Sequence, residues 1–118
     1  MPKRILIADD DQTTRDVLTK LATLQGYDVT TVTNGVDLLS VVGVESFDLV
    51  ITDLIMTDMD GASAAINMKI QGNTTPVIAL TGIPAHKMRR VQDSFTRVFN
   101  KPVNVRELFE YVESLIGK

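Results

Sequence analysis

The chain has 118 residues, a length that fits one domain with its own hydrophobic core. Hydrophobic residues make up 44% of it, which excludes a disordered chain, and the net charge of −3 argues against nonspecific nucleic-acid binding. The absence of cysteine excludes disulfides and thiolate metal sites. No apolar stretch approaches the roughly 18 residues of a membrane span, and none near the N-terminus is long enough for a signal peptide. We therefore expect a cytoplasmic domain.

Apolar runs alternate along the chain with helical patterns, as in a series of β-α-β units. The runs are continuous, which is typical of strands that are buried on both faces of a sheet. We expect five parallel strands, over residues 4–9, 28–32, 48–52, 76–80 and 97–100.

The first expected helix follows the first strand. It carries an apolar stripe at helical spacing, made of Val17, Leu18, Leu21 and Leu24. Gly26 follows this stripe at a position that favours a left-handed residue.

Four further helices are expected. The second covers 35–44, where the position between two strands favours helix, and the third begins after Asp60, whose side chain can cap it. The fourth, over about 84–94, offers only Met88 and Val91 as clear core residues, so we expect it to be loosely anchored. The last helix has one apolar face, formed by Val105, Leu108, Phe109, Val112, Leu115 and Ile116.

Five strands and five helices predict one doubly wound α/β domain over residues 1–118, a (βα)5 fold of the flavodoxin-like type. Right-handed crossovers favour the strand order 2-1-3-4-5. The topological switch point then lies between the first and third strands, where such folds place their sites.

Charged residues follow three of the predicted strands. Asp9 and Asp10 follow the first apolar run, Asp53 the third and Lys101 the fifth, so parallel strands would bring them to one edge of the sheet. Two carboxylates about 4 Å apart repel by roughly 1 kcal/mol in water and about 4 kcal/mol near a protein surface. Such a cluster calls for a cation, and a cation there calls for an anionic substrate such as phosphate.

Each of these residues also has an ordinary structural explanation. The aspartates at 9–11 could cap a helix, although one would suffice. Asp53 alone would be a turn residue, and Lys101 with Pro102 could form a strand-ending turn with a cis bond. Thr81, after the fourth apolar run, could be an ordinary strand-to-loop hydroxyl. Taken together, the aspartates favour a metal site, because Mg²⁺ prefers oxygen ligands.

The same residues could also handle phosphate. A carboxylate such as Asp53 can accept a phosphoryl group to give an acyl phosphate. A metal would offset charge on the incoming oxygens, and Lys101 would hold another oxygen. The Thr81 hydroxyl could donate a hydrogen bond to the phosphoryl group, for which Gly82 leaves room.

Several short segments in a fixed order carry a resemblance to a known family. They are residues 5–10 (ILIADD), 53–56 (DLIM), 59–61 (MDG), 76–82 (PVIALTG) and 101–102 (KP). In this order and spacing they make the whole chain resemble the receiver domain of two-component response regulators.

The resemblance implies that Asp53 is the phosphoacceptor. Asp9 and Asp10 would hold Mg²⁺, helped by Asp53 and the backbone carbonyl of Ile55. The donor would be a phosphohistidine on a sensor kinase or a histidine phosphotransfer protein. The protein would then be a signalling switch that promotes its own phosphorylation and slow dephosphorylation, and not an enzyme with an external substrate.

The resemblance also implies an output surface. Thr81 and Lys101 would contact the phosphoryl group and report it to the surface formed by the 84–94 helix, the 97–100 strand and the last helix. A downstream effector or output domain would bind there, without direct contact to nucleic acid or membrane. A basic patch near this surface could meet an acidic partner or a second copy after phosphorylation; its members are Lys87, Arg89, Arg90 and Arg97.

The chain departs from the family pattern at several positions. Val98 stands where an aromatic residue is usual, and Phe99 should face the other side of the strand, so we expect the output surface to change by helix movement without a ring switch. Thr57 stands where proline is common. Ile55 and Ile83 cannot orient an attacking water by hydrogen bonding, so we expect slow self-dephosphorylation.

Three other functions remain open on the sequence. A phosphate-ester hydrolase would carry its Asp nucleophile after the first strand, with a second Asp two residues later. A flavin carrier would need hydroxyls after the first strand, where this chain has three aspartates. An interaction module that works without phosphorylation would tolerate losses in the acidic cluster.

Overall fold

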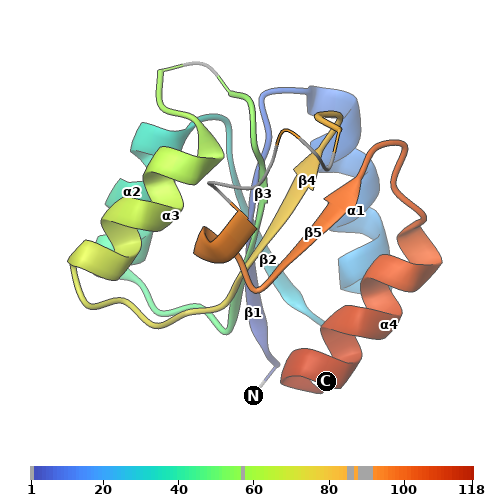
Figure 1. The fold of residues 1–118 in the computed structure, drawn as a ribbon. Coiled ribbons are helices and arrows are strands. Elements are labelled where there is room, and N and C mark those ends of the chain that lie inside the picture. The colour runs from blue at the N-terminus through green and yellow to red at the C-terminus, as the bar shows by residue number, and fades with distance from the viewer. Residues whose placement is uncertain (1, 57, 85–86, 88–91) are drawn as a thin grey trace.

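A five-stranded parallel sheet with helices on both faces forms the protein (Figure 1). The structure is a computed structural model that describes residues 2–56, 58–84, 87 and 92–118. The strands are β1 (Arg4–Ala8), β2 (Asp28–Val32), β3 (Leu49–Asp53), β4 (Val77–Thr81) and β5 (Arg97–Asn100). The helices in the described residues are α1 (Gln12–Leu24), α2 (Gly35–Val44), α3 (Gly61–Ile70) and α4 (Val105–Ile116), with a 3₁₀ turn η2 (Gln92–Ser94) before β5.

The strands pair in the order β2-β1-β3-β4-β5, which confirms the predicted order and the flavodoxin-like architecture. Every residue of β3 and β4 is buried, as continuous apolar runs predict for central strands. Alternate strand residues face opposite sides. Leu6 and Val50 pack toward α2 and α3, while Ile7 and Ile51 pack toward α1 and α4. Figure 1 shows these helix pairs on the two sides of the sheet.

Each of the four α-helices in the described residues begins after a side chain that caps it. The caps accept hydrogen bonds from backbone N–H groups in the first turn, and they are Asp11, Asn34, Asp60 and Asn104. The predicted cap at Asp60 is confirmed by a 2.7 Å hydrogen bond from the Ser63 N–H. Gly26 has the predicted left-handed conformation, with φ of 96°.

Three predicted strands had boundaries that were wrong by one residue. The predicted strand 4–9 ends at Ala8, because the Asp9 side chain bonds to the turn that follows. The predicted strand 48–52 runs from Leu49 to Asp53, and the predicted strand 76–80 runs from Val77 to Thr81. In both strands the last residue still pairs with a neighbouring strand, with Leu80 and Asn100 respectively.

The predicted helix over 84–94 falls largely outside the described residues. Its last part, Gln92–Ser94, is the 3₁₀ turn η2. Thr57, His86 and the basic positions 89 and 90 also lie outside the described residues. The predicted last helix is α4, and its buried residues are Leu108, Phe109 and Val112.

Two glycines allow α2 and α3 to approach the loop after β3 closely. A Cβ on Gly61 would lie 2.3 Å from the Asp53 carbonyl oxygen, and a Cβ on Gly35 would lie 2.3 Å from the Met59 carbonyl oxygen. The N–H groups of these glycines donate to the carbonyl oxygens of Leu54 (2.8 Å) and Met59 (3.0 Å). The starts of both helices therefore fix the loop that leaves the sheet at Asp53.

Candidate functional site

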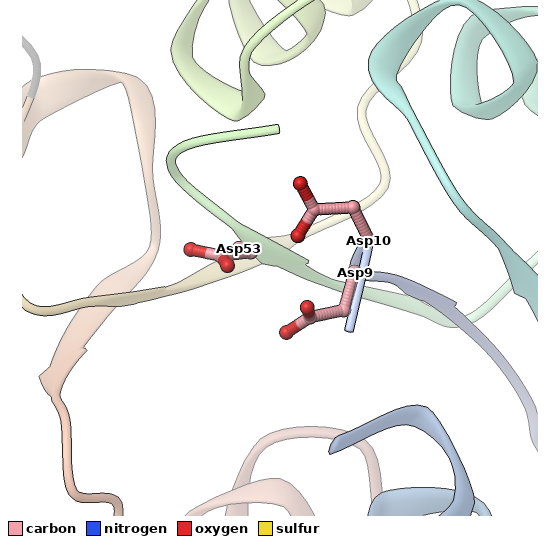
Figure 2. A group of neighbouring side chains, drawn as sticks. All are labelled: Asp9, Asp10 and Asp53. Atoms are coloured by element: carbon pink, nitrogen blue, oxygen red, sulfur yellow. The ribbon is translucent and has the colours of Figure 1, made fainter. Parts of the chain in front are cut away.

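The three predicted aspartates meet at the carboxyl edge of the sheet, between β1 and β3 (Figure 2). These strands are neighbours, with Ala8 paired to Thr52, so the residues that follow lie side by side. Asp9, Asp10 and Asp53 each offer one carboxylate oxygen, and these oxygens lie within 4.8 Å of one another. The predicted acidic cluster is therefore present at the switch point of the sheet.

Asp9 is the most buried member of this cluster, with 1% of its surface exposed. The Asp11 N–H donates to its Oδ1 at 2.9 Å. The Arg15 guanidinium donates to the Asp9 backbone carbonyl at 2.7 Å, and this contact was not predicted from the sequence. An arginine in the first turns of the helix that follows the acidic run is the signal that could have indicated it.

Lys101 joins the cluster from the end of β5. Its Nζ lies 2.9 Å from Asp53 Oδ2 and 3.6 Å from Asp9 Oδ2. The Lys101 N–H donates to the Thr81 carbonyl at 2.8 Å, and the bond to Pro102 is cis. The ammonium therefore reaches the two buried carboxylates from a fixed backbone position.

Thr81 ends β4 on the same edge and is 1% exposed. Its Oγ1 accepts a 3.0 Å hydrogen bond from the Ile83 N–H, as an ordinary strand-to-loop hydroxyl would. The Asn100 side chain donates to the Ile83 carbonyl at 3.1 Å and holds the same loop. Accepting this bond leaves the hydroxyl hydrogen of Thr81 free to act as a donor elsewhere.

Burial and neighbouring charges shift the pKa values in this cluster. Burial raises the pKa of Asp9; the Asp11 N–H opposes this rise, and the charge of Asp53 adds to it. Burial by itself would lower the pKa of Lys101, but its hydrogen bond and charge interaction with Asp53, together with the charge of Asp9, outweigh burial and raise that pKa. The ammonium is therefore firmly charged, while Asp9 holds its proton more tightly than an exposed aspartate.

The residues of the cluster fit a hard divalent cation. Asp9 Oδ2 is buried and has no hydrogen-bond donor among the described residues, although Lys101 lies nearby. A buried carboxylate oxygen without a donor is costly, and a cation would satisfy it. The Ile55 N–H lies 3.3 Å from Asp53 Oδ1, which brings the Ile55 backbone beside the cluster. The predicted role of the Ile55 carbonyl stays a prediction.

The aromatic residue of β5, Phe99, faces away from Val98. Val98 packs toward α2 and α3, while Phe99 is buried on the other face, and this confirms the predicted alternation. The Phe99 ring meets the Tyr111 ring edge-on at 5.9 Å between centroids. The Arg97 guanidinium lies over both rings, at 4.7 and 4.8 Å from their centroids.

The sequence pattern of the response regulator receiver domain family matches residues 5–113. The chain belongs to this family. This receiver domain is 31% identical over 116 residues to the response regulator receiver protein CpdR of Brucella abortus, a match that covers 97% of each chain. It is also 42% identical over 77 residues to the sensor protein EvgS of Escherichia coli K12, which covers 65% of this chain but only 6% of EvgS.

Solved structures agree with this assignment. The fold of the receiver domain is similar to that of response regulator protein TrrA of Thermotoga maritima, solved in complex with Mg²⁺-BeF. The TM-score is 0.88 at 28% identity, over 96% of this chain and 98% of that one.

The family match and the acidic cluster together show what the chain does. It is a phosphoryl-accepting switch of two-component signalling. Receiver domains work with sensor kinases or phosphotransfer proteins, so its role is in signalling. No helix in the described part of the chain is long and apolar enough to cross a membrane.

Proposed function

We propose that Asp53 is the residue that accepts the phosphoryl group. The observation that carries this proposal is the position of its carboxylate, beside the aspartates that follow β1 and 2.9 Å from the Lys101 ammonium. Asp53 is 8% exposed and Asp9 is 1% exposed, while Asp10 is exposed to solvent. A nucleophile has to be reachable by its donor, and this difference favours Asp53 over Asp9.

Asp9, Asp10 and Asp53 would hold Mg²⁺, with the Ile55 carbonyl as a further ligand. Mg²⁺ is preferred because the donors are all oxygens and because the exposed side of Asp10 leaves room for retained waters. When bound, the ion would reduce the repulsion between the carboxylates and the incoming phosphoryl oxygens.

The chain's own residues then account for the transfer. An oxygen of Asp53 attacks the phosphorus of a phosphohistidine, an O–P bond forms as the N–P bond breaks, and the donor imidazole leaves with the electron pair and takes up a proton. Lys101 keeps its charge and hydrogen-bonds a phosphoryl oxygen. The Thr81 hydroxyl donates its free hydrogen to another oxygen.

The partners follow from this chemistry. The donor would be a sensor histidine kinase or a histidine phosphotransfer protein, in the cytoplasm, and one receiver domain would occupy residues 1–118. The output surface would include β5 and α4, where an effector or output domain binds. Since Val98 carries no ring and the Phe99 ring is packed against Arg97 and Tyr111, we expect this surface to change without a ring swing.

Intact-mass spectrometry after incubation with acetyl phosphate tests the proposal. We expect one phosphoryl adduct that requires Mg²⁺, is absent in Asp53→Ala, and persists in Asp16→Ala, which changes an exposed aspartate of α1. An adduct that survives Asp53→Ala would contradict the assignment of the acceptor. If a folded wild-type chain gives no adduct with acetyl phosphate or a phosphohistidine donor and does not bind Mg²⁺, it is an interaction module that works without phosphorylation.

A further inference from the structure

The turn that joins β1 to α1 carries two of the three proposed metal ligands, Asp9 and Asp10. Their side chains leave this turn in different directions (Figure 2). Asp9 is buried, whereas Asp10 is exposed to solvent. An exposed side chain has few neighbours that could orient it, so the backbone of the turn largely decides where the Asp10 carboxylate lies.

The backbone of Asp9 is held from two sides. Its N–H donates to the carbonyl of Val32 in β2 at 3.2 Å. Its carbonyl accepts a 2.7 Å hydrogen bond from Nη1 of Arg15 in α1. Because the peptide unit is planar, a fixed Asp9 carbonyl also fixes the direction in which the chain enters Asp10. Arg15 therefore acts on Asp10 through the backbone, without touching its side chain.

The start of α1 places Arg15 for this contact. Asp11 caps the helix, since its side chain accepts hydrogen bonds from the N–H (3.0 Å) and the hydroxyl (2.6 Å) of Thr14. The Arg15 N–H donates to the Asp11 carbonyl at 3.1 Å and closes the first turn. Side chains on a helix tilt toward its N-terminus, so the Arg15 side chain reaches back over the β1–α1 turn to Asp9.

A guanidinium beside a proposed cation site is unexpected from charge alone. Like charges repel, and the repulsion grows where water is excluded. The hydrogen bond from Arg15 to the Asp9 carbonyl has a charged donor, and such bonds are about twice as strong as those between neutral groups. The charge of Arg15 would therefore weaken Mg²⁺ binding, while its hydrogen bond would favour binding by holding the ligands in place.

We propose that Arg15 is a positioning residue for the Mg²⁺ site. It holds the peptide between Asp9 and Asp10, so that both carboxylates stay beside that of Asp53. This role rests on the proposed function, because it concerns the proposed Mg²⁺ ligands. Loss of an outer partner that orients metal ligands commonly lowers metal affinity by about 10–100-fold. We expect this effect to outweigh the relief of charge repulsion when Arg15 is removed.

Calorimetric titration of the protein with Mg²⁺, in the absence of phosphodonor, tests the proposal. Arg15→Met removes the donor and the charge, and it should raise the dissociation constant for Mg²⁺ about tenfold. Arg15→Lys keeps the charge and one donor group, so its affinity should lie between those of the wild type and Arg15→Met. The matched control is Arg106→Met in α4, which removes the same charge from an exposed ion pair with Glu110 and should leave the affinity unchanged.

The direction of the change decides between the two effects of Arg15. Equal or tighter Mg²⁺ binding in Arg15→Met would overturn the proposal, because charge alone predicts this result. An affinity of Arg15→Lys no higher than that of Arg15→Met would also overturn it. If the wild type itself does not bind Mg²⁺, the proposed metal site fails and this role fails with it. If the wild type binds Mg²⁺ and Arg15→Met binds it equally well, only the role of Arg15 is refuted.

Amide hydrogen exchange in metal-free protein gives a second, structural measurement. The Asp11 N–H donates to Asp9 Oδ1 at 2.9 Å within the turn, and the Val50 N–H donates to the Pro76 carbonyl at 3.0 Å within the sheet. Arg15→Met should speed exchange at Asp11 severalfold more than at Val50, because it loosens the turn locally. A general loss of stability would speed both amides alike, and equal changes at the two positions would contradict a positioning role.

Discussion

The Lys101 ammonium lies 2.9 Å from Asp53 Oδ2, and this ion pair joins the end of β5 to the end of β3. The same ammonium is 3.6 Å from Asp9 Oδ2. One positive charge thus offsets two buried carboxylates, and a metal ion would compete with it for the same oxygens. Metal binding at Asp53 and Asp9 would therefore act against this ion pair.

Replacing Lys101 should have opposite effects on the stability of the metal-free protein and on its affinity for Mg²⁺. Lys101→Met should destabilise the metal-free protein by about 1 kcal/mol, since the carboxylates lose their counter-charge. It should also raise Mg²⁺ affinity, because no resident ammonium competes for Asp53. Urea unfolding and calorimetric Mg²⁺ titration measure these quantities, and Lys101→Arg is the control that keeps the charge. Weaker Mg²⁺ binding in Lys101→Met would contradict this competition.

The raised pKa of Asp9 predicts how stability depends on pH. Burial is its main cause, and the folded state therefore binds the Asp9 proton more tightly than the unfolded state. The stabilisation is complete below the ordinary value of 3.8 and is lost as pH rises through the higher folded pKa. Asn does not ionise, so Asp9→Asn does not lose this stabilisation as pH rises. The metal-free variant should therefore be more stable than the metal-free wild type at neutral pH, by about 1 kcal/mol.

Urea unfolding over a series of pH values checks this prediction. The advantage of Asp9→Asn should vanish in acid, and Mg²⁺ should no longer stabilise the variant although it stabilises the wild type. Asp16→Asn changes an exposed aspartate and should show neither effect. If Asp9→Asn gave a constant difference at all pH values, ionisation of Asp9 would not be the cause.

The close approach at Gly61 predicts a steric effect on the acceptor. Gly61→Ala places a Cβ 2.3 Å from the Asp53 carbonyl oxygen, so it should destabilise the fold by about 1–3 kcal/mol and reduce phosphorylation. Gly43→Ala meets no atom within 4 Å and should instead stabilise α2 by about 0.5 kcal/mol. Thermal unfolding of the two variants at low protein concentration compares them. Equal effects would show that the approach at Gly61 is not tight.

Apolar side chains beside the site predict a long-lived phosphoryl group. Ile55 is 63% exposed two residues after Asp53, and Ile83 stands two residues after Thr81. Neither can orient an attacking water. Ile55→Asn and Ile83→Glu should each shorten the phosphoryl half-life severalfold, measured by loss of the adduct mass with time. Unchanged half-lives in both variants would refute this explanation.

Much of the fold could be predicted because its signals are local. Continuous apolar runs mark strands with two covered faces, and right-handed crossovers leave few strand orders. The ends of strands were less certain, since pairing with a neighbour decides them. Asp53 and Thr81 look like loop residues in the sequence, but each still pairs with an adjacent strand.

The acidic cluster could also be predicted, because residues that end parallel strands share one edge. The hydrogen bonds and the relative burial of its residues could not be predicted. The hydrogen bond from Arg15 to the Asp9 carbonyl depends on where the guanidinium reaches across the β1–α1 turn. The same holds for the burial of Asp9 relative to Asp10, which follow each other in the sequence but differ in exposure.

The central claim is that Asp53 carries the phosphoryl group, and site mapping tests it most directly. Borohydride reduces an acyl phosphate to an alcohol, so it converts a phosphorylated aspartate to homoserine. After treatment with phosphodonor and Mg²⁺, reduction and peptide sequencing by mass spectrometry should find homoserine at position 53 and unchanged aspartate at positions 9 and 10. Homoserine at position 9 or 10 in place of 53 would contradict the account.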